Sequence, residues 1–383
     1  MQLMAKEELL QNMELGLIPD QEIRERIRIE LEKRLRWGYK ETHEEQLSQL
    51  LDLVHSLKGM KMATEMENLD LKLYEAPMEF LKIQHGSNMK QSAGYYTDES
   101  TTLDEAEIAM LDLYMERAQI KDGQSVLDLG CGLGAVALYG ANKFKKCQFT
   151  GVTSSVEQKD YIQGKCKELK LTNVKVLLAD ITTYETEERF DRIFAVELIE
   201  HMKNYQLLLK KISEWMKDDG LLFVEHVCHK TLAYHYEPVD AEDWYTNYVF
   251  PAGTLTLSSA SMLLYFQVSS FTKFRLKYIV LLALNHNSRM ILETVMAWQD
   301  DVAVVNQWTL SGKHYSRSHE EWLKNMDKNI VEFKEIMRSI TKTEEEANRL
   351  LNFWRIFCMC GAELFGYKNG EEWMLTHLLF KKK

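Results

Sequence analysis

The sequence predicts an α/β fold in which helices cover a central, mostly parallel sheet. From residue 125 onward, short apolar segments alternate with segments of helical periodicity, which is the pattern of strand–helix–strand units. A glycine-rich stretch, Gly130–Gly134, follows the first apolar segment, as a tight turn from strand to helix requires. Glycine and proline number only 18 and 4 of 383 residues, which disfavours collagen-like and disordered chains.

The first hundred residues are predicted to form a helical region ahead of an α/β core that spans residues 101–383. After Pro19, apolar side chains recur every four residues and mark one buried helix face: Ile23, Ile27, Leu31 and Leu35. The arginines and glutamates between them predict a solvated opposite face, and Gly38 is placed to end this helix. A second helix is predicted to begin at Thr102, because Thr102 and Glu105 have the spacing of a capping box.

Six apolar segments are predicted to be strands: Ser125–Leu129, Phe149–Val152, Val174–Leu178, Phe190–Val196, Leu221–Glu225 and Trp373–Phe380. Helical segments separate the first five, so right-handed crossovers and parallel pairing are expected. The aromatic-rich region after the fifth strand suits a lid over the carboxyl ends of the strands. Residues 228–315 are assigned to this lid or substrate region.

Charge and composition exclude several classes of protein. A net charge of −11 disfavours nucleic-acid binding, which needs a surplus of cations. The apolar run Tyr278–Leu284 is far shorter than the roughly 20 residues that cross a bilayer, and the amino terminus lacks a signal-peptide core, so no membrane partner is expected. The six cysteines form no Cys-x-x-Cys pair, which predicts free thiols, a cytoplasmic location and no metal site.

The turn after the first strand is the first candidate cofactor site. Gly130, Gly132 and Gly134 allow a sharp turn and a close approach of ligand to backbone. The dinucleotide fingerprint needs a third glycine one residue later than Gly134. Asp128, before the turn, suits a ligand with an amino-acid moiety. We therefore favour S-adenosyl-L-methionine over a dinucleotide and over a purely structural turn.

The ends of the second and third strands offer further cofactor contacts. An acidic residue usually closes the second strand and binds the ribose, but here Thr153 and Ser154 stand there, with Gln158 one helical turn later. Hydroxyl and amide groups can replace the carboxylate with weaker hydrogen bonds. Asp180, after the third strand, is placed for the adenine amino group, although an exposed turn aspartate is the alternative.

The segment after the fourth strand is the candidate catalytic site. Glu197 and Glu200 would share a face if a helical turn started there, with His201 beside them. Two acids and an imidazole at the carboxyl edge of a parallel sheet suit removal of a proton from a nucleophile. The alternative is a capping acid with a surface histidine. His226, Cys228 and His229, after the fifth strand, are interpreted as packing and hydrogen-bonding residues, with a zinc site as the alternative.

Five collinear motifs resemble one known family: Asp128–Gly132, Val152–Ser154, Glu197–Tyr205, Phe223–His226 and Phe250–Gly253. They resemble the cyclopropane-fatty-acid-synthase superfamily, whose members are class I S-adenosyl-L-methionine-dependent methyltransferases with a Rossmann-like sheet. Within it, the chain is similar to plant benzylisoquinoline alkaloid N-methyltransferases of the coclaurine type. The likeness extends from Leu15 to Lys383.

The resemblance implies a set of site residues. Ser92 and Gly130 would hold the methionine part of the cofactor. The ribose and adenine of the cofactor would be contacted by residues at the ends of the second, third and fourth strands: Thr153, Ser154, Gln158, Asp180, Ile181 and Val196. Glu197, Glu200 and His201 match the catalytic cluster. The alkaloid side would be formed by Tyr74, Glu75, Trp354 and Phe357.

The resemblance also implies the reaction, which is methyl transfer to the ring nitrogen of a 1-benzylisoquinoline amine such as coclaurine. The alternatives are an N-methyltransferase for protoberberine, pavine or reticuline-type amines, and a cofactor-binding homologue with impaired catalysis. The resemblance implies that pavine-type members carry alanine at the position of Glu197, so the glutamate favours the coclaurine type. The sequence does not fix the oligomeric state, and a homodimer is consistent with it.

Residues 268–299 depart from the family pattern, in which Leu263–Gln267 run directly into Asp300–Val302. The 32 additional residues contain neither glycine nor proline. Valine codons begin with GT and one glutamine codon is CAG, so this segment can start and end as an intron does. We interpret it as a retained intron or gene-model error, with an evolved lid extension as the alternative.

We expect the 351-residue chain without residues 268–299 to be the better enzyme. Loop length alone costs little, roughly 0.6 kcal/mol per doubling, but added apolar surface beside the lid would disturb it. Both chains should be assayed with coclaurine, and equal turnover would contradict this expectation. Sequencing the transcript tests the intron hypothesis, which fails if the predominant message contains these codons.

Overall fold

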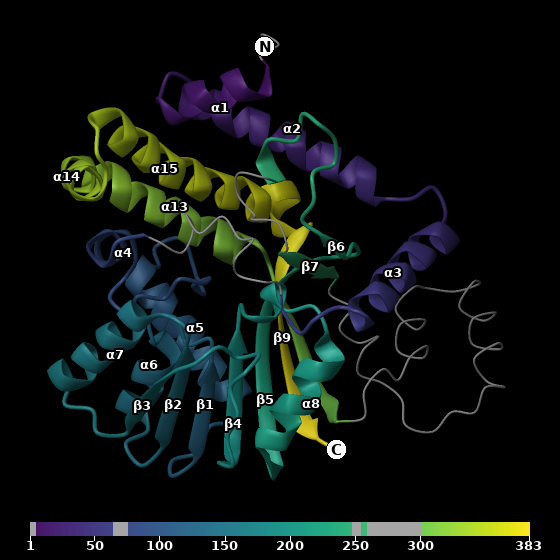
Figure 1. The fold of residues 1–383 in the computed structure, drawn as a ribbon, viewed down its shortest axis with the longest axis vertical. Helices are drawn as coiled ribbons and strands as arrows, with labels where there is room; N and C mark the ends of the chain where they lie inside the picture. Colours follow the sequence, from purple (N-terminus) through teal and green to yellow (C-terminus); the bar gives the residue numbers. More distant parts are fainter. Residues whose placement is uncertain (1–4, 64–75, 247–253, 259–300) are drawn as a thin grey trace.

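The computed structural model describes residues 5–63, 76–246, 254–258 and 301–383 (Figure 1). Two of the expected substrate residues, Tyr74 and Glu75, lie outside these ranges, as does the additional segment 268–299. The predictions made for them therefore stay predictions.

A single mixed sheet forms the centre of the fold and runs in the order β3-β2-β1-β4-β5-β7-β6, with β9 paired to β5 and β8. Its strands are β1 (Ser125–Leu129), β2 (Gln148–Thr153), β3 (Val174–Leu178), β4 (Phe190–Val196), β5 (Met216–His229), β6 (Tyr234–His235), β7 (Leu255–Ser258), β8 (Val302–Leu310) and β9 (Trp373–Lys382). Strands β1 to β5 pair in parallel, whereas β9 is antiparallel to both β5 and β8. The predicted α/β fold with a parallel sheet is confirmed.

The predicted strands agree closely with the observed ones. β1, β3 and β4 have the predicted bounds, and β5 is longer than predicted at both ends, since it begins at Met216 beside Phe190 of β4 and continues along β9 to His229. Leu127, Ile193 and Phe194 in the two central strands are completely buried. Strands covered on both faces carry continuous apolar runs, which is why the sequence showed them clearly.

The helices lie on both faces of the sheet and beyond its carboxyl edge (Figure 1). They are α1 (Lys6–Glu14), α2 (Asp20–Gly38), α3 (His43–Lys58), α4 (Met78–Gln84), α5 (Leu103–Arg117), α6 (Ala135–Lys143), α7 (Val156–Glu168), α8 (Tyr205–Trp215), α13 (Lys313–Lys328), α14 (Ile330–Ile340) and α15 (Glu344–Gly366), with the short 3₁₀ helices η3 (Ile199–His201) and η4 (Tyr367–Gly370). Among the helices that the structure describes, no one combines the length and apolar content needed to cross a bilayer.

The two helices predicted near the amino terminus are present. Ile27 and Leu31 of α2 are buried, and α5 begins with the capping box of Thr102 and Glu105, in which each residue binds the other's backbone N–H. The predicted solvated face of α2 is only partly correct. Arg24 binds Glu363 on α15 at 3.0 Å, and Arg34 is buried against Asp243.

Three helices near the carboxyl terminus were not predicted individually. In Figure 1, α13, α14 and α15 lie together beyond the sheet, with α2 and α1 on the far side of α15. The described parts of the predicted lid region 228–315 comprise the end of β5, the strands β6, β7 and β8, and the first residues of α13, and all four strands belong to the sheet. The division into domains and a lid stays a prediction.

Candidate active site at the carboxyl edge of the sheet

The glycine turn after β1 has the backbone that its sequence requires. Gly130 has φ +65°, and a Cβ atom there would lie 2.9 Å from Leu198. A larger residue would therefore strain the backbone and collide with the segment after β4. The turn after β1 and the turn after β4 are in direct contact at this point.

Asp128 lies beneath this glycine turn with an unused carboxylate oxygen. Its Oδ2 atom is buried and has no hydrogen-bond partner in the described part of the chain. Burial raises the pKa of Asp128 to about 7. A buried acid without a partner is costly, so this atom points to a ligand group that donates a hydrogen bond or carries positive charge.

The other predicted cofactor residues follow neighbouring strands of the same edge. The Thr153 hydroxyl donates to Gln158 Oε1 at 2.6 Å, which links two of them, and Ser154 is exposed. Asp180 is also exposed, and its Oδ1 accepts the N–H of Thr182 at 2.7 Å. Ile181 and Val196 are partly buried. Asp180 thus stabilises its own turn, which is the alternative recognised in the sequence.

Ser92 reaches the edge from the segment between α4 and α5. It is buried, and its hydroxyl accepts a hydrogen bond from the Lys90 ammonium. The segment that carries both residues had no periodic signal in the sequence.

The catalytic segment turns differently from the expectation. Glu197 has φ +48°, a conformation that costs energy for a side-chain-bearing residue, and its N–H donates to the Glu225 carbonyl at 2.9 Å. The helical turn begins only at Ile199, as the 3₁₀ helix η3. Glu197 and Glu200 therefore do not share a helix face, because Glu197 still follows the β4–β5 register and turns the chain out of the sheet.

Each of these two glutamates nevertheless presents one unpartnered oxygen to the site. Glu197 Oε2 accepts from the Tyr315 hydroxyl at 2.7 Å, and Glu200 Oε1 accepts from the Val227 N–H at 2.7 Å. The second oxygen of each carboxyl group is buried and has no hydrogen-bond partner within the described ranges. The two carboxyl groups are thus fixed in place and still able to bind a ligand.

Burial controls the protonation of the cluster. It raises the pKa of Glu197 to about 8, with the negative charge of Glu225 as the second cause. It raises the pKa of Glu200 well above its usual value, and Glu197 adds to this effect. His201 is kept neutral, because burial and the charge of Lys203 lower its pKa to about 4. Carboxyl groups of raised pKa are stronger proton acceptors once ionised, and a cationic ligand would favour their ionised form.

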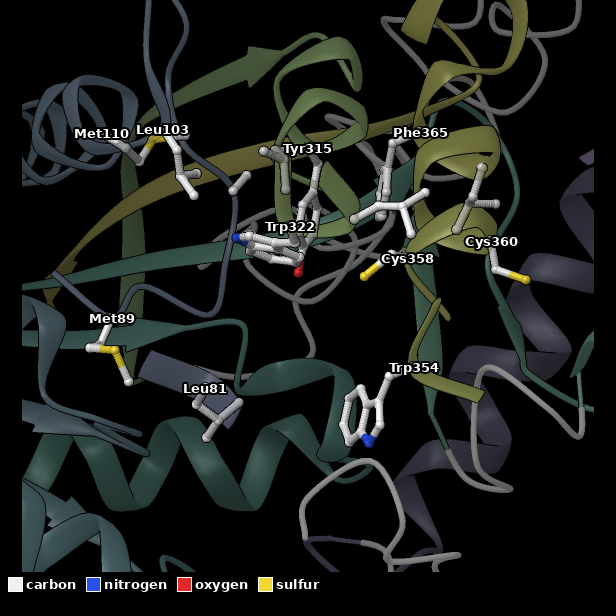
Figure 2. Packing of buried hydrophobic residues seen from close by; sticks show 14 of the residues in the cluster. Leu81, Met89, Leu103, Met110, Tyr315, Trp322, Trp354, Cys358, Cys360 and Phe365 are labelled. Carbon is white, nitrogen blue, oxygen red and sulfur yellow. The ribbon is translucent and has the colours of Figure 1, made fainter. Parts of the chain in front are cut away.

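An aromatic wall leads away from Glu197, formed by Tyr315 and His319 of α13 with Phe357 and Trp354 of α15. Neighbouring ring centroids are 4.9 Å apart for Tyr315–His319, 5.6 Å for His319–Phe357 and 5.8 Å for Phe357–Trp354. Figure 2 shows Tyr315 beside Trp322, with Trp354 on the neighbouring helix. The predicted residues Trp354 and Phe357 are therefore connected to the Glu197 carboxyl group through Tyr315 and His319.

Tyr315 and Glu225 adjoin the candidate site and were not predicted from the sequence. Tyr315 is 118 residues from Glu197 along the chain, and no local motif marks it. Glu225 stands inside one of the family motifs, but its contacts with Tyr114 and His377 depend on α5 and β9.

His226 and His229, near the end of β5, bind backbone groups around them. His229 Nδ1 accepts the N–H groups of Thr231 and Leu232 at 3.0 and 2.9 Å, which supports the hydrogen-bonding interpretation. Within the residues that could be searched, no group of three His, Cys, Asp or Glu side chains is arranged to hold a metal ion.

Comparison with known proteins assigns the family. Residues 61–325, more than half of the chain, match the family described as mycolic acid cyclopropane synthetase. The chain belongs to the mycolic acid cyclopropane synthetase family. The resemblance expected from the motifs is thereby confirmed. The family match includes the glycine turn and the catalytic segment but ends before α14 and α15.

Full-length relatives cover the rest of the chain. (S)-Coclaurine N-methyltransferase of Papaver somniferum is 88% identical over 383 residues, with both chains covered completely. The (S)-coclaurine N-methyltransferase of Thalictrum flavum subsp. glaucum is 56% identical, over 98% of this chain and 96% of the relative. A crystal structure of coclaurine N-methyltransferase bound to N-methylheliamine and SAH is 55% identical. It superposes with a TM-score of 0.87 over 98% of this chain and 99% of that one.

Glu197 should make folding stability depend on pH. Between its ordinary pKa of 4.5 and its folded-state pKa of about 8, the folded chain holds a proton that the unfolded chain has released. The free energy of unfolding therefore falls as the pH rises through this window. We expect Tm to decrease less between pH 5 and 8 in Glu197→Gln than in the wild type, measured by thermal unfolding. The exposed control Glu214→Gln should follow the wild type, and a Glu197→Gln slope that does the same would contradict the assignment.

Proposed function

We propose that this chain is an S-adenosyl-L-methionine-dependent N-methyltransferase that methylates the ring nitrogen of 1-benzylisoquinoline amines such as coclaurine. The observation that carries the proposal is a pair of buried, partly unsatisfied carboxyl groups, Glu197 and Glu200, beside the glycine turn. The full-length identity of 88% to a coclaurine N-methyltransferase supports this assignment.

The carboxyl edge of the sheet fits S-adenosyl-L-methionine. The unpartnered Oδ2 of Asp128 suits the amino group of the methionine part, and the Gly130 turn leaves room for close approach to the backbone. Ser92 would hold the same part of the cofactor. Thr153 and Gln158 would bind the ribose, with Ser154 beside them. Asp180, Ile181 and Val196 would flank the adenine and the neighbouring strand end.

The substrate nitrogen must lose a proton before it can react. A secondary amine is mostly an ammonium ion at neutral pH and then has no free electron pair. Glu200, with His201 beside it, would take that proton, since burial makes its carboxylate a strong acceptor. Glu197 would orient the ammonium and stabilise its charge through the buried oxygen that has no partner.

When bound, S-adenosyl-L-methionine supplies a methyl group on a positively charged sulfur, which accepts the electron pair of a neutral nitrogen. The chain contributes mainly by holding the nitrogen and the donor in reach of each other. Trp354 and Phe357 would pack against the alkaloid rings, and aromatic faces favour a cationic nitrogen nearby. Tyr74 and Glu75 remain proposed substrate residues on the basis of the family resemblance.

The proposed location is the cytoplasm. All six cysteines are free thiols in the structure, as is usual for proteins of a reducing compartment.

A paired measurement tests the proposal. Binding of S-adenosyl-L-methionine should be titrated and methyl transfer should be assayed with coclaurine, protoberberine and pavine amines in parallel. Turnover with a preference for coclaurine is expected. Binding without turnover would instead identify a catalytically impaired homologue.

Asp128→Asn should weaken S-adenosyl-L-methionine binding. Loss of a charge-assisted hydrogen bond in a buried site costs about 1.5–3 kcal/mol, so Kd should rise roughly 10- to 100-fold in calorimetric titration. Asp191→Asn is a suitable control, because Asp191 binds Ser125 and Lys217 at the opposite edge of the sheet. An unchanged Kd in Asp128→Asn would refute the proposed contact.

Glu200→Gln should lower kcat by about 10²- to 10⁴-fold, which is the usual contribution of a positioned base. The defect should shrink as the pH rises, because more of the amine is then neutral without help from the enzyme. Kinetic assays between pH 7 and 10 measure this, with cofactor binding as the test of integrity. Glu372→Gln, another completely buried glutamate, should keep wild-type kcat. A defect in Glu200→Gln that is independent of pH would argue against its role as base.

A further inference from the structure

Lys90 is a buried cation that the mechanism above does not use. Only 2% of its surface is exposed, in the segment between α4 and α5. Its ammonium donates to the Ser92 hydroxyl and to the Ala93 carbonyl, the latter at 2.8 Å. It also lies over the Tyr114 ring, 4.9 Å from the centroid. A buried lysine without carboxylates nearby would be very costly, so its charge needs an explanation.

The carboxyl groups around Lys90 belong to the active site and to the strand beside it. Burial has the largest effect and lowers the pKa of the Lys90 ammonium below its usual value, whereas Glu225, Glu197 and Glu107, in that order, favour its charged form. Glu225 on β5 is itself held as an anion. Its two oxygens bind the Tyr114 hydroxyl and His377 Nε2, both at 2.5 Å. Lys90 thus connects this fixed anion with Glu197.

One peptide unit joins Lys90 to Glu197. The carbonyl of Ala93 accepts from the Lys90 ammonium, and the backbone of the same residue lies close enough to the Glu197 carboxyl group to lower its pKa. Ala93 is completely buried, so water cannot replace either contact. Loss of Lys90 would release the Ala93 carbonyl and the Ser92 hydroxyl together.

We propose that Lys90 is a positioning residue that aligns Ser92 with the cofactor and supplies the positive charge that lets Glu197 face the substrate as a carboxylate. The inference rests on the proposed function for its kinetic part. It assigns to Lys90 a role that acts through two other residues, and Lys90 itself does not touch the reacting atoms.

The charged groups around Lys90 and Glu197 determine how the loss of Lys90 changes the protonation of Glu197. Four groups face Glu197 from different elements. They are Lys90 in the segment before α5, Glu225 on β5, Glu200 on η3 and the Tyr315 hydroxyl on α13. The additional groups near Lys90 are Glu107 and Tyr114 on α5 and His377 on β9, with Arg117 bound to His377. Since Lys90 is the cation that acts on Glu197, its removal should favour the protonated form of Glu197.

Three variants separate charge from packing. Lys90→Gln keeps hydrogen-bond donors without the charge, Lys90→Met removes both, and Lys90→Arg keeps the charge. The matched control is Arg192→Met, because Arg192 is also a buried cation bound to backbone carbonyls, those of Ala118 and Gln119, but at the amino edge of β4.

The kinetic readout is the dependence of kcat/KM on pH. The part of this profile that rises from low pH is called the acid limb. We expect Lys90→Gln and Lys90→Met to move it to higher pH, with about tenfold lower kcat/KM on the acid side for each pH unit of displacement. Lys90→Arg should restore much of the wild-type profile. Arg192→Met should lower Tm and leave the limb in place. A limb that stays at its wild-type position in both Lys90→Gln and Lys90→Met would overturn the inference.

Two readouts do not depend on alkaloid turnover and keep this inference distinct from the proposed function. Binding of S-adenosylhomocysteine should weaken in Lys90→Met, because Ser92 loses its donor. The fall of Tm with rising pH should be steeper in Lys90→Gln than in the wild type, and this difference should shrink when Glu197→Gln is added. If neither readout changes, Lys90 is only a packing residue. If both change while no amine is methylated, the proposed substrate is wrong and the role of Lys90 stands.

Discussion

The active site depends on two carboxyl groups being kept away from water. Glu197 and Glu200 are held at the carboxyl edge of the sheet by a tyrosine hydroxyl and by a backbone N–H of the neighbouring strand. Burial would normally leave such acids protonated and inert. Here burial makes the two acids selective for cationic ligands, because a positive charge replaces the hydration that the carboxylates have lost. The aromatic wall provides the apolar surface along which the rest of such a ligand can lie.

A second set of charged and hydrogen-bonding groups surrounds these two acids. Glu225 lies behind Glu197 and is held as an anion by hydrogen bonds from Tyr114 and His377 and by the nearby Lys90, so the interior holds one permanent anion next to an acid whose charge can change. The strained backbone at Glu197 is fixed by its bond to the Glu225 carbonyl. Strand β5 therefore positions the candidate catalytic segment through its backbone, and its Glu225 side chain raises the pKa of Glu197.

The sequence revealed those parts of the molecule whose signals are local. The central strands, the capping box of α5 and the glycine turn each follow from a few neighbouring residues, and the structure has them. The condition under which Glu197 and Glu200 would share a helix face, a helical turn starting at Glu197, is not met, because the positive φ at this glutamate is imposed by the sheet and not by its neighbours in sequence. Helices α13 to α15 escaped individual prediction, although Thr343 and Glu346 have capping-box spacing at the start of α15. Tyr315 could not be found, since only tertiary packing brings it to Glu197.

The pairing of β5 with β9 has a consequence for the order in which the molecule can be completed. β9 covers one side of β5 from Leu221 to His229, and it is the last strand of the described chain to leave the ribosome. Until then β5 offers an open edge, Glu225 lacks its histidine, and the catalytic turn rests on an unfinished strand. Nascent chains should therefore be vulnerable to edge-to-edge association during this interval, and chaperones that shield exposed strands would act on them then.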